Sequence, residues 1–297
     1  MKRWWIYQKE RFPLAAHGPL IAAFSACAVA FSSMLRDAPA PGWQAYLAAF
    51  VVCLLMFLQL RIADEFKDQE EDARWRPYRP VPRGLVKLSE LRAIFIAAAL
   101  IQAAMACLLD WRLLGVLAIA WTYLGLMSVE FFCRDWLKAR PVIYLITHMG
   151  IMPLVDYFAT SCEWLPRGAS TPEGIGWFLS ASFFNGIVIE TGRKLRQPAA
   201  EEPGVDTYSH LWGMRTAALV WLGAMVSTLI CATLAARRID FVAPVAATLG
   251  ALLIVALWVA WRYLKHGLKG GRLEALTGVW TLALYLILGL VPLLLAH

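Results

Sequence analysis

The sequence carries little charge for its length and lacks the patterns of several common site types. Only 16% of its 297 residues are Asp, Glu, Lys or Arg, whereas a soluble globular domain carries about 25%. Its six cysteines are scattered and form no CxxC pair, so neither a zinc site nor a disulfide framework is indicated. There is no glycine-rich phosphate loop and no alternating strand pattern. These absences argue against an ordinary soluble domain.

Long apolar stretches take the place of these missing features. Hydrophobic residues make up 60% of the chain, and a membrane-spanning helix needs roughly 20 of them in a row. We therefore predict an all-α polytopic membrane protein with about nine transmembrane helices around a central cavity. The expected helices lie near residues 18–35, 43–63, 89–109, 113–133, 142–161, 174–192, 215–235, 241–262 and 274–296.

Basic residues are distributed unevenly among the expected loops. All but five of the 28 Lys and Arg residues precede the first helix or lie in the even-numbered loops. The exceptions are Arg36, Arg112, Arg167, Arg237 and Arg238. The positive-inside rule then predicts a cytoplasmic N-terminus and a C-terminus on the opposite side. The net charge of +7 is thus a topology signal, and no nucleic-acid partner is expected.

No domain boundary is visible, and we expect a single integral membrane domain over 1–297. The first segment has the basic flank of a secretory signal, but further membrane helices follow, so an uncleaved first helix is expected. The longest polar stretches, near 64–88 and 193–214, follow the second and sixth helices and are both predicted to be cytoplasmic. This offset hints at two related four-helix halves plus one further helix.

The first of these polar stretches begins with DEFKDQEEDARWRPYRPVPRG at residues 64–84, and six of its first nine residues are carboxylates. If the second helix continues into it, with about 100° between successive residues, then Glu65, Asp68 and Asp72 share one face, with Arg61 between them. Such a row of acids needs a compensating cation. Mg²⁺ typically takes one or two protein carboxylates and completes its shell with water and phosphate oxygens. The alternative is a solvated loop of mixed charge.

This segment resembles the first signature of the UbiA superfamily of intramembrane prenyltransferases, [N/D]DxxDxxxD followed by RPxPxG. The matching residues are Asp64, Glu65, Asp68, Asp72 and Arg79-Pro80-Val81-Pro82-Arg83-Gly84. Asp64 stands where the family usually has Asn, and Glu65 where it usually has Asp, but both keep an oxygen ligand. The resemblance implies Mg²⁺ as cofactor, an isoprenyl diphosphate as substrate, and a nine-helix bundle with its N-terminus inside.

A second polar region, YLGLMSVEFFCRDWLKARP, lies between the fourth and fifth expected helices. The family often has a Tyr, then a Ser, then an Arg/Lys cluster here, and Tyr123, Ser128, Arg134 and Lys138 are similar. Arg could grip a diphosphate as a two-pronged donor and Lys as a point charge. Ordinary flanking charge at the membrane surface is the alternative, and the sequence leaves both open.

The family's second signature, DxxxD followed by G-x-x-T and a later Gly, is only partly present. Gly204, Thr207 and Gly213 fit its tail. Glu190 stands at the first acidic position, but four residues on is Lys194.

Two alternatives follow for this altered signature. Glu190 with Glu201 or Glu202 could hold a second metal ion, or Arg193 and Lys194 could replace that ion and contact the diphosphate directly.

Several further polar residues are predicted to lie in the cytoplasmic half of the bilayer, where ionisable groups usually face an interior cavity. Glu130, His148 and Asn185 are among them, and we expect His148 to be a hydrogen-bonded packing residue. Asp156, about two-thirds of the way across, is expected to be a paired structural acid, with a proton acceptor as the alternative.

These residues make up the expected site. Catalytic roles are expected for Asp64, Asp68, Asp72 and Glu190. Metal binding is expected from Asp64, Glu65, Asp68, Asp72, Glu190, Glu201 and Glu202. Substrate binding is expected from Arg61, Arg79, Arg83, Tyr123, Arg134, Lys138, Asn185, Arg193 and Lys194. The polar loops 64–88 and 193–214 are expected to cap the site.

The expected chemistry is ionisation of an isoprenyl diphosphate in a dry, membrane-embedded cavity, because water would quench the allylic cation. Capture of the cation by an acceptor, aromatic in the simplest case, would give prenyl transfer. Capture by the chain's own double bond would give a cyclic terpene, as in UbiA-type terpene cyclases. A transporter is a remote alternative that leaves RPxPxG unexplained.

Overall fold

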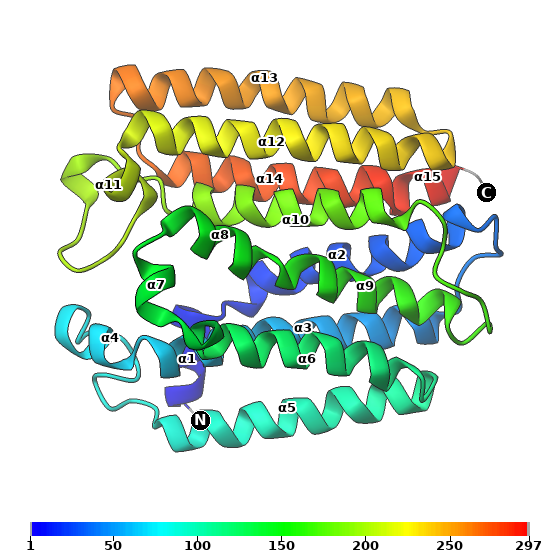
Figure 1. The fold of residues 1–297 in the computed structure, drawn as a ribbon, viewed down its shortest axis with the longest axis horizontal. Coiled ribbons are helices and arrows are strands. Elements are labelled where there is room, and N and C mark those ends of the chain that lie inside the picture. The colour runs from blue at the N-terminus through cyan, green and yellow to red at the C-terminus, as the bar shows by residue number, and fades with distance from the viewer. Residues whose placement is uncertain (1, 296–297) are drawn as a thin grey trace.

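The structure is a computed structural model and describes residues 2–295. Within this range the chain forms helices and no strand, and the long helices run side by side along one axis (Figure 1). Three short helices mark one end of the bundle, which we call the motif end: α4 (Gln69–Trp75), α7 (Arg134–Lys138) and α11 (Tyr208–Trp212). The last helix, α15 (Leu290–Leu295), lies at the opposite end.

Seven helical stretches are long and apolar enough to cross a membrane, which confirms the all-α polytopic membrane fold. They are α2 with Leu14–Leu35, α3 with Trp43–Lys67, α5 with Leu88–Leu109, α8 and α9 with Pro141–Trp164, α12 and η3 with Met214–Ile239, α13 with Val242–His266, and α14 and α15 with Gly271–Leu295. Helix α6 (Leu113–Ser128) is apolar but shorter, and α10 (Ile175–Gly192) is not among the seven. The predicted count of nine is therefore not confirmed.

Short elements complete the chain outside these stretches. They are α1 (Lys2–Arg11), η1 (Glu130–Phe132), η2 (Pro198–Ala200) and η3 (Arg237–Ile239). Helix α1 precedes the first spanning helix and lies at the motif end (Figure 1).

Three predicted helices differ from those observed, each for a local reason. The helix expected over 113–133 ends at Ser128, because residues 130–132 have φ angles of 51°, 51° and 59°, in the left-handed region. The helix expected over 142–161 breaks at Gly150 into α8 (Pro141–Met149) and α9 (Ile151–Trp164). The last expected helix likewise breaks, at Gly289, between α14 (Gly271–Leu288) and α15.

Gly150 is required by a close approach between helices. A Cβ atom at this position would overlap the hydroxyl oxygen of Tyr123 on α6. That hydroxyl donates to the carbonyl oxygen of Thr147 on α8 over 2.6 Å. Tyr123 therefore holds the broken helix against α6.

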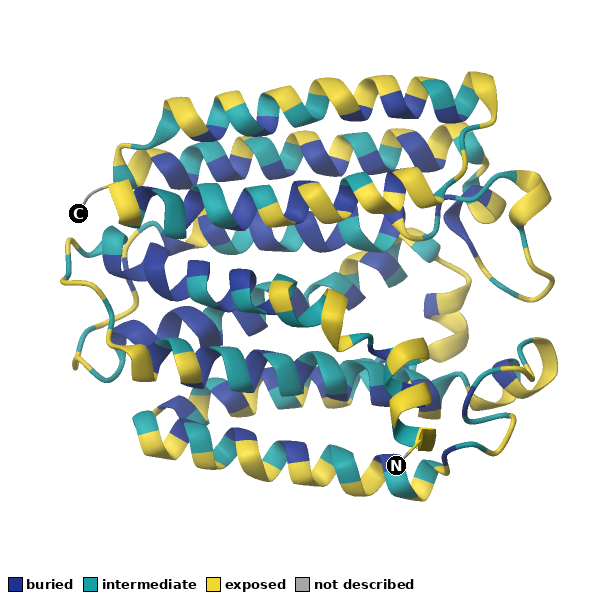
Figure 2. Ribbon diagram, turned by 180° about the vertical axis from the view of Figure 1, so that it is seen from behind, coloured by how far each residue is buried: buried dark blue, intermediate teal, exposed yellow. Residues whose placement is uncertain are grey.

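Many small residues are buried in the bundle and many large apolar ones are exposed on it, as expected for a protein in lipid. Packing between membrane helices depends on close van der Waals contact, which small side chains allow. On α12 (Met214–Ala236), six buried positions are alanines: Ala217, Ala218, Ala224, Ala232, Ala235 and Ala236. The outermost helices, α5 and α13, carry many exposed residues (Figure 2), including Leu100, Leu108 and Ile254.

The basic segments that were predicted to share one side of the membrane meet at the motif end. Arg83 pairs with Glu10, and Lys138 pairs with Glu71. Further along the chain, the Gln197 side chain donates to the carbonyl oxygen of Leu268 over 3.0 Å. That this end faces the cytoplasm remains a prediction.

Candidate functional site

The acidic segment continues the helical hydrogen bonding of α3. The amide of Asp68 donates to the carbonyl oxygen of Asp64 over 2.9 Å, that of Asp72 to Asp68 over 2.8 Å, and that of Arg76 to Asp72 over 2.9 Å. Asp68 itself links α3 to α4 with φ −94° and ψ 9°. Asp64, Asp68 and Asp72 therefore follow one another at intervals of about one helical turn.

Two acids of this row are held by cations of the same segment. Asp64 lies 3.5 Å from the guanidinium of Arg61 and 3.9 Å from the Nζ atom of Lys67. Asp72 is buried and pairs with Arg76 over 2.6 Å and with Arg79 over 2.7 Å. The first arginine of RPxPxG thus touches the last acid of the acidic signature.

Glu65 pairs outside its own segment. Its Oε1 atom bonds to Nε of Arg11 on α1, and both side chains are buried. Arg83, the second arginine of RPxPxG, also contacts α1, through a 3.0 Å pair with Glu10. The N-terminal helix thereby contacts both halves of the first signature.

Asp68 differs from its neighbours because its side chain makes neither an ion pair nor a hydrogen bond with any residue in 2–295. It is half-buried. Burial raises the pKa of Asp68, and the charges of Asp64 and Asp72 raise it further, against the opposing effect of Lys67. A half-buried carboxylate one helical turn from two other acids is a group that a cation would stabilise.

These residues fit a Mg²⁺ ion held by few protein ligands. The described part of the chain contains no group of three or more His, Cys, Asp or Glu side chains close enough to hold a metal together. Mg²⁺ usually needs only one or two carboxylates, with water and phosphate oxygens as the other ligands. Two groups have a carboxylate oxygen free to bind such an ion. They are Asp68, whose side chain has no partner, and Glu65, whose Oε2 atom has no hydrogen-bond partner within 2–295.

The second acidic position lies at the end of α10, at the same end of the bundle (Figure 1). Both carboxylate oxygens of Glu190 are paired, with Nε of Arg193 over 2.7 Å and with Nζ of Lys194 over 2.9 Å. The Lys194 ammonium also lies 5.5 Å from the ring centre of Tyr208. The Glu190 carboxylate raises the pKa of Arg193, and the charge of Asp64 adds a smaller effect in the same direction.

Glu201 and Glu202 each have a polar partner of their own. The hydroxyl of Thr207 is 2.7 Å from both carboxylate oxygens of Glu201, and it also caps α11 by accepting from the His210 amide over 3.1 Å. Glu202 pairs with Arg196 over 2.9 Å. Among residues 2–295, these two acids and Glu190 do not form a group of three that could hold a metal ion.

The substrate-binding residues predicted between the fourth and fifth expected helices make two kinds of contact. Tyr123 is committed to the Thr147 carbonyl oxygen, as described above. Lys138 on α7 bonds to the Glu71 carboxylate on α4, and the guanidinium of Arg134 lies 3.8 Å from the same carboxylate. The Lys138 hydrogen bond lowers the pKa of Glu71 below its usual range.

A network around Lys67 was not anticipated. Its ammonium donates to the Tyr144 hydroxyl over 2.8 Å and lies 3.5 Å from Glu130. The His148 ring stacks on that of Tyr144, with the ring centres 3.8 Å apart, and its Nε2 atom lies 3.2 Å from Glu130 Oε2. These contacts agree with the expected packing role of His148. Burial raises the pKa of Glu130, but His148 and Lys67 lower it below its usual value overall.

The sequence does contain a signal that Lys67 belongs to the site, because it is the one basic residue among the acids of 64–72. Arg11 gave no such signal, since it lies in a basic stretch that the topology rule already explained.

Asn185 and Asp156 lie in the bundle interior. Thr281 donates to the Asn185 side-chain oxygen over 3.2 Å, while the Tyr285 hydroxyl donates to Asp156 over 2.8 Å. The second Asp156 oxygen, Oδ1, is buried and has no hydrogen-bond partner among the described residues.

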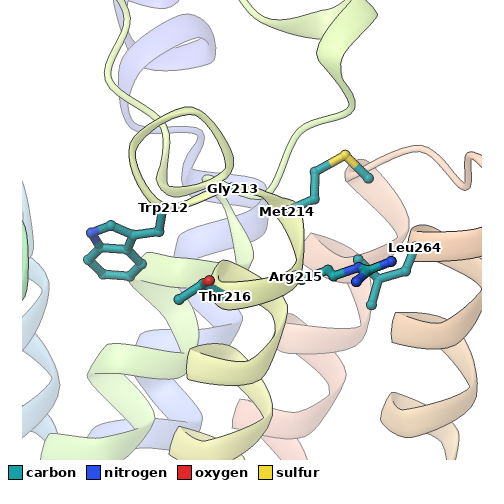
Figure 3. A pocket seen from close by; sticks show the side chains of 6 residues that line it. All are labelled: Trp212, Gly213, Met214, Arg215, Thr216 and Leu264. Atoms are coloured by element: carbon teal, nitrogen blue, oxygen red, sulfur yellow. The ribbon is translucent and has the colours of Figure 1, made fainter.

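Two cavities lie away from the acidic signature. One of about 380 Å³ is lined by residues 212–216 around the start of α12 and by Leu264 of α13 (Figure 3). The other, of about 550 Å³, lies between the ends of α3, α5 and α9 that are remote from the motif end, and Trp43, Leu108 and Arg167 are among its lining residues. The central cavity that the sequence suggested stays a prediction.

An apolar helical bundle with acids and arginines gathered at one end defines a polytopic membrane protein with a polar site at that end. The model of the UbiA prenyltransferase family matches residues 23–271, and the chain belongs to this family. No curated protein sequence matches the chain. The fold is similar to the apo structure of a UbiA homolog from Aeropyrum pernix K1, with a TM-score of 0.67 and 14% identity, over 90% of this chain and 94% of that one.

Proposed function

We propose that the protein is a Mg²⁺-dependent intramembrane enzyme that ionises an isoprenyl diphosphate and transfers the prenyl group to an acceptor, most simply an aromatic ring. Membership of the UbiA prenyltransferase family supports a prenyltransferase-type activity. The observation that carries the finer proposal is the uncompensated Asp68 carboxylate, one turn from Asp64 and Asp72, at the end of an apolar bundle.

The polar residues of the motif end have distinct roles in this proposal. Asp68, with Asp64 or Glu65, holds Mg²⁺, which when bound neutralises the charge that develops on the leaving diphosphate. The charge of Asp64 acts on Arg193, and Glu190 joins Arg193 to Lys194. These two cations therefore supply further positive charge for the phosphate oxygens.

The bond changes are simple. The C1–O bond of the prenyl diphosphate breaks and its electron pair leaves with the diphosphate. A carbon atom of the acceptor then forms a bond to C1 and loses one proton. The apolar bundle excludes water, which would otherwise capture the cation.

A terpene cyclase is the second candidate, and Asp156 favours it. Cyclisation ends when a proton is lost from a carbon far from the diphosphate. Asp156 reaches Ser182 through the Tyr285 hydroxyl, and Ser182 lies eight residues before Glu190 on α10, a rise of about 12 Å. No cation pairs with Asp156 within 2–295, so its carboxyl group is a candidate acceptor for such a proton.

The test measures diphosphate release from purified protein with Mg²⁺ and geranyl, farnesyl or geranylgeranyl diphosphate, with and without a panel of phenolic acceptors. Release that requires a phenol, with a prenylated phenol in the lipid extract, supports transfer. Release without a phenol, together with a cyclic hydrocarbon or terpene alcohol, supports the cyclase. No release from any of the three diphosphates overturns both candidates, and Asp68→Ala is the inactive control.

A further inference from the structure

Helix α1 is an unexpected neighbour of the acidic signature. It lies before residue 23, where the match to the family model begins. Even so, Arg11 pairs with Glu65 and Glu10 pairs with Arg83, so α1 contacts both the acidic and the arginine-rich half of the signature. Tyr7, on the same helix, is buried against Ile62 of α3.

Three buried polar atoms lie at this contact without a hydrogen-bond partner in residues 2–295. They are the hydroxyl of Tyr7, the Nη2 atom of Arg11 and the Oε2 atom of Glu65. The exposed fractions are 4% for Tyr7, 8% for the Arg11 side chain and 1% for Glu65. A buried polar atom left unpaired costs about 1–3 kcal/mol, so three at one contact indicate a polar ligand.

The three atoms belong to one small region. Tyr7 and Arg11 are four residues apart on α1 and share a face of the helix. Arg11 bonds directly to Glu65. Tyr7 belongs to the same buried cluster as Ile62, which precedes Glu65 on α3 by three residues.

The chemistry of the three atoms is that of two donors beside one acceptor. A tyrosine hydroxyl is protonated at neutral pH, so that of Tyr7 can donate a hydrogen bond. Arg11 uses its Nε atom for Glu65 and keeps Nη2 for another acceptor. Phosphate oxygens accept from arginine and hydroxyl donors, while a free carboxylate oxygen suits a cation.

We infer that α1 completes the diphosphate site: Arg11 and Tyr7 donate to a phosphate oxygen of the substrate, and the free oxygen of Glu65 faces its Mg²⁺. This rests on the proposed function. Arg11 also fixes Glu65 through the other oxygen, so the same side chain binds phosphate and orients a metal ligand.

Binding of inorganic pyrophosphate tests the inference without turnover. The purified full-length protein in detergent is titrated with pyrophosphate, with and without Mg²⁺, by calorimetry and by the shift in melting temperature. Arg11→Gln should weaken pyrophosphate binding about tenfold or more, the loss of one charge-assisted hydrogen bond. Arg3→Gln is the matched control, because Arg3 lies on the same helix but pairs with Glu90 at the surface, and it should change binding by less than about twofold.

Tyr7→Phe separates ligand binding from folding. The hydroxyl has no partner in the described protein, so its removal should leave the ligand-free melting temperature unchanged or higher. The same variant should bind pyrophosphate about three- to tenfold more weakly.

The outcomes distinguish this inference from the proposed function. If the unaltered protein binds pyrophosphate and Tyr7→Phe and a folded Arg11→Gln bind it as tightly, α1 is outside the site and the inference is wrong. If Arg11→Gln does not fold, Tyr7→Phe decides alone. If the unaltered protein neither binds pyrophosphate with Mg²⁺ nor releases diphosphate from any prenyl diphosphate, the proposed function itself fails and takes the inference with it.

Discussion

The hydroxyl of Tyr78 donates a hydrogen bond to the Oε2 atom of Glu202 over 3.1 Å and so joins the two polar loops of the motif end. The two residues are 124 positions apart in the chain. Trp75 and Gly204 make a second contact between the same loops, since a Cβ atom on Gly204 would overlap the Trp75 ring. Together these contacts hold the two loops against each other, and that the loops cap an active site remains a prediction.

Gly204→Ala should push the two loops apart and lower activity about tenfold or more. Gly204 has φ +69°, so alanine also introduces backbone strain of about 1–2 kcal/mol. Gly168→Ala is the matched control, because Gly168 has the same φ of +69° but a Cβ atom added there would have no neighbour within 4 Å. Diphosphate release and melting temperature are measured for both. Equal activity in the two variants would show that the contact between the loops is dispensable.

Asp68→Asn should abolish turnover, by at least about 100-fold, yet leave the protein as stable as before or more stable. The pKa of Asp68 is raised in the folded state, so its ionised form at neutral pH opposes folding, and asparagine removes that cost. Melting temperature without Mg²⁺ and diphosphate release are the two measurements. Substantial remaining activity would contradict the assignment of Asp68 to the metal.

Asp72→Ala should also abolish turnover but should destabilise the protein by about 1–3 kcal/mol. Asp72 is buried and holds both Arg76 and Arg79, which would lose their partner. Denaturant unfolding in detergent measures the difference from Asp68→Asn. An equal stability of the two variants would mean that these ion pairs contribute little.

Glu190→Gln should leave the half-saturating Mg²⁺ concentration within about twofold of its original value, because both Glu190 oxygens already hold Arg193 and Lys194. Lys194→Gln should raise KM for the prenyl diphosphate about tenfold through the loss of a charged contact to phosphate. Steady-state kinetics over a range of Mg²⁺ concentrations checks both. A tenfold higher half-saturating Mg²⁺ concentration in Glu190→Gln would instead favour a second metal ion.

Asp156→Asn distinguishes the two candidate reactions. In a cyclase it should change the product mixture while diphosphate release stays within about threefold, because ionisation occurs at the other end of the substrate. In a transferase both rate and product should be retained. Gas chromatography of the lipid extract measures the products, and Tyr285→Phe, which removes the hydrogen bond to Asp156, should shift them in the same direction.

Composition was enough to predict the class of fold, and the resemblance of residues 64–84 to a known signature indicated the family. Apolar segments of about 20 residues can satisfy their backbone groups in lipid only as helices, so composition settles the architecture. The spacing that puts Glu65, Asp68 and Asp72 on one helical face is a local property and could be read from the sequence directly.

Only the tertiary structure shows which polar and charged side chains form pairs. Nothing in the order of residues pairs Arg11 with Glu65 or Tyr78 with Glu202, because such pairs depend on how helices far apart in the chain pack together. The breaks at Gly150 and Gly289 and the left-handed turn after Ser128 also escaped prediction. Hydropathy reports which segments are apolar and carries no information on backbone angles or on the partner that each side chain finds.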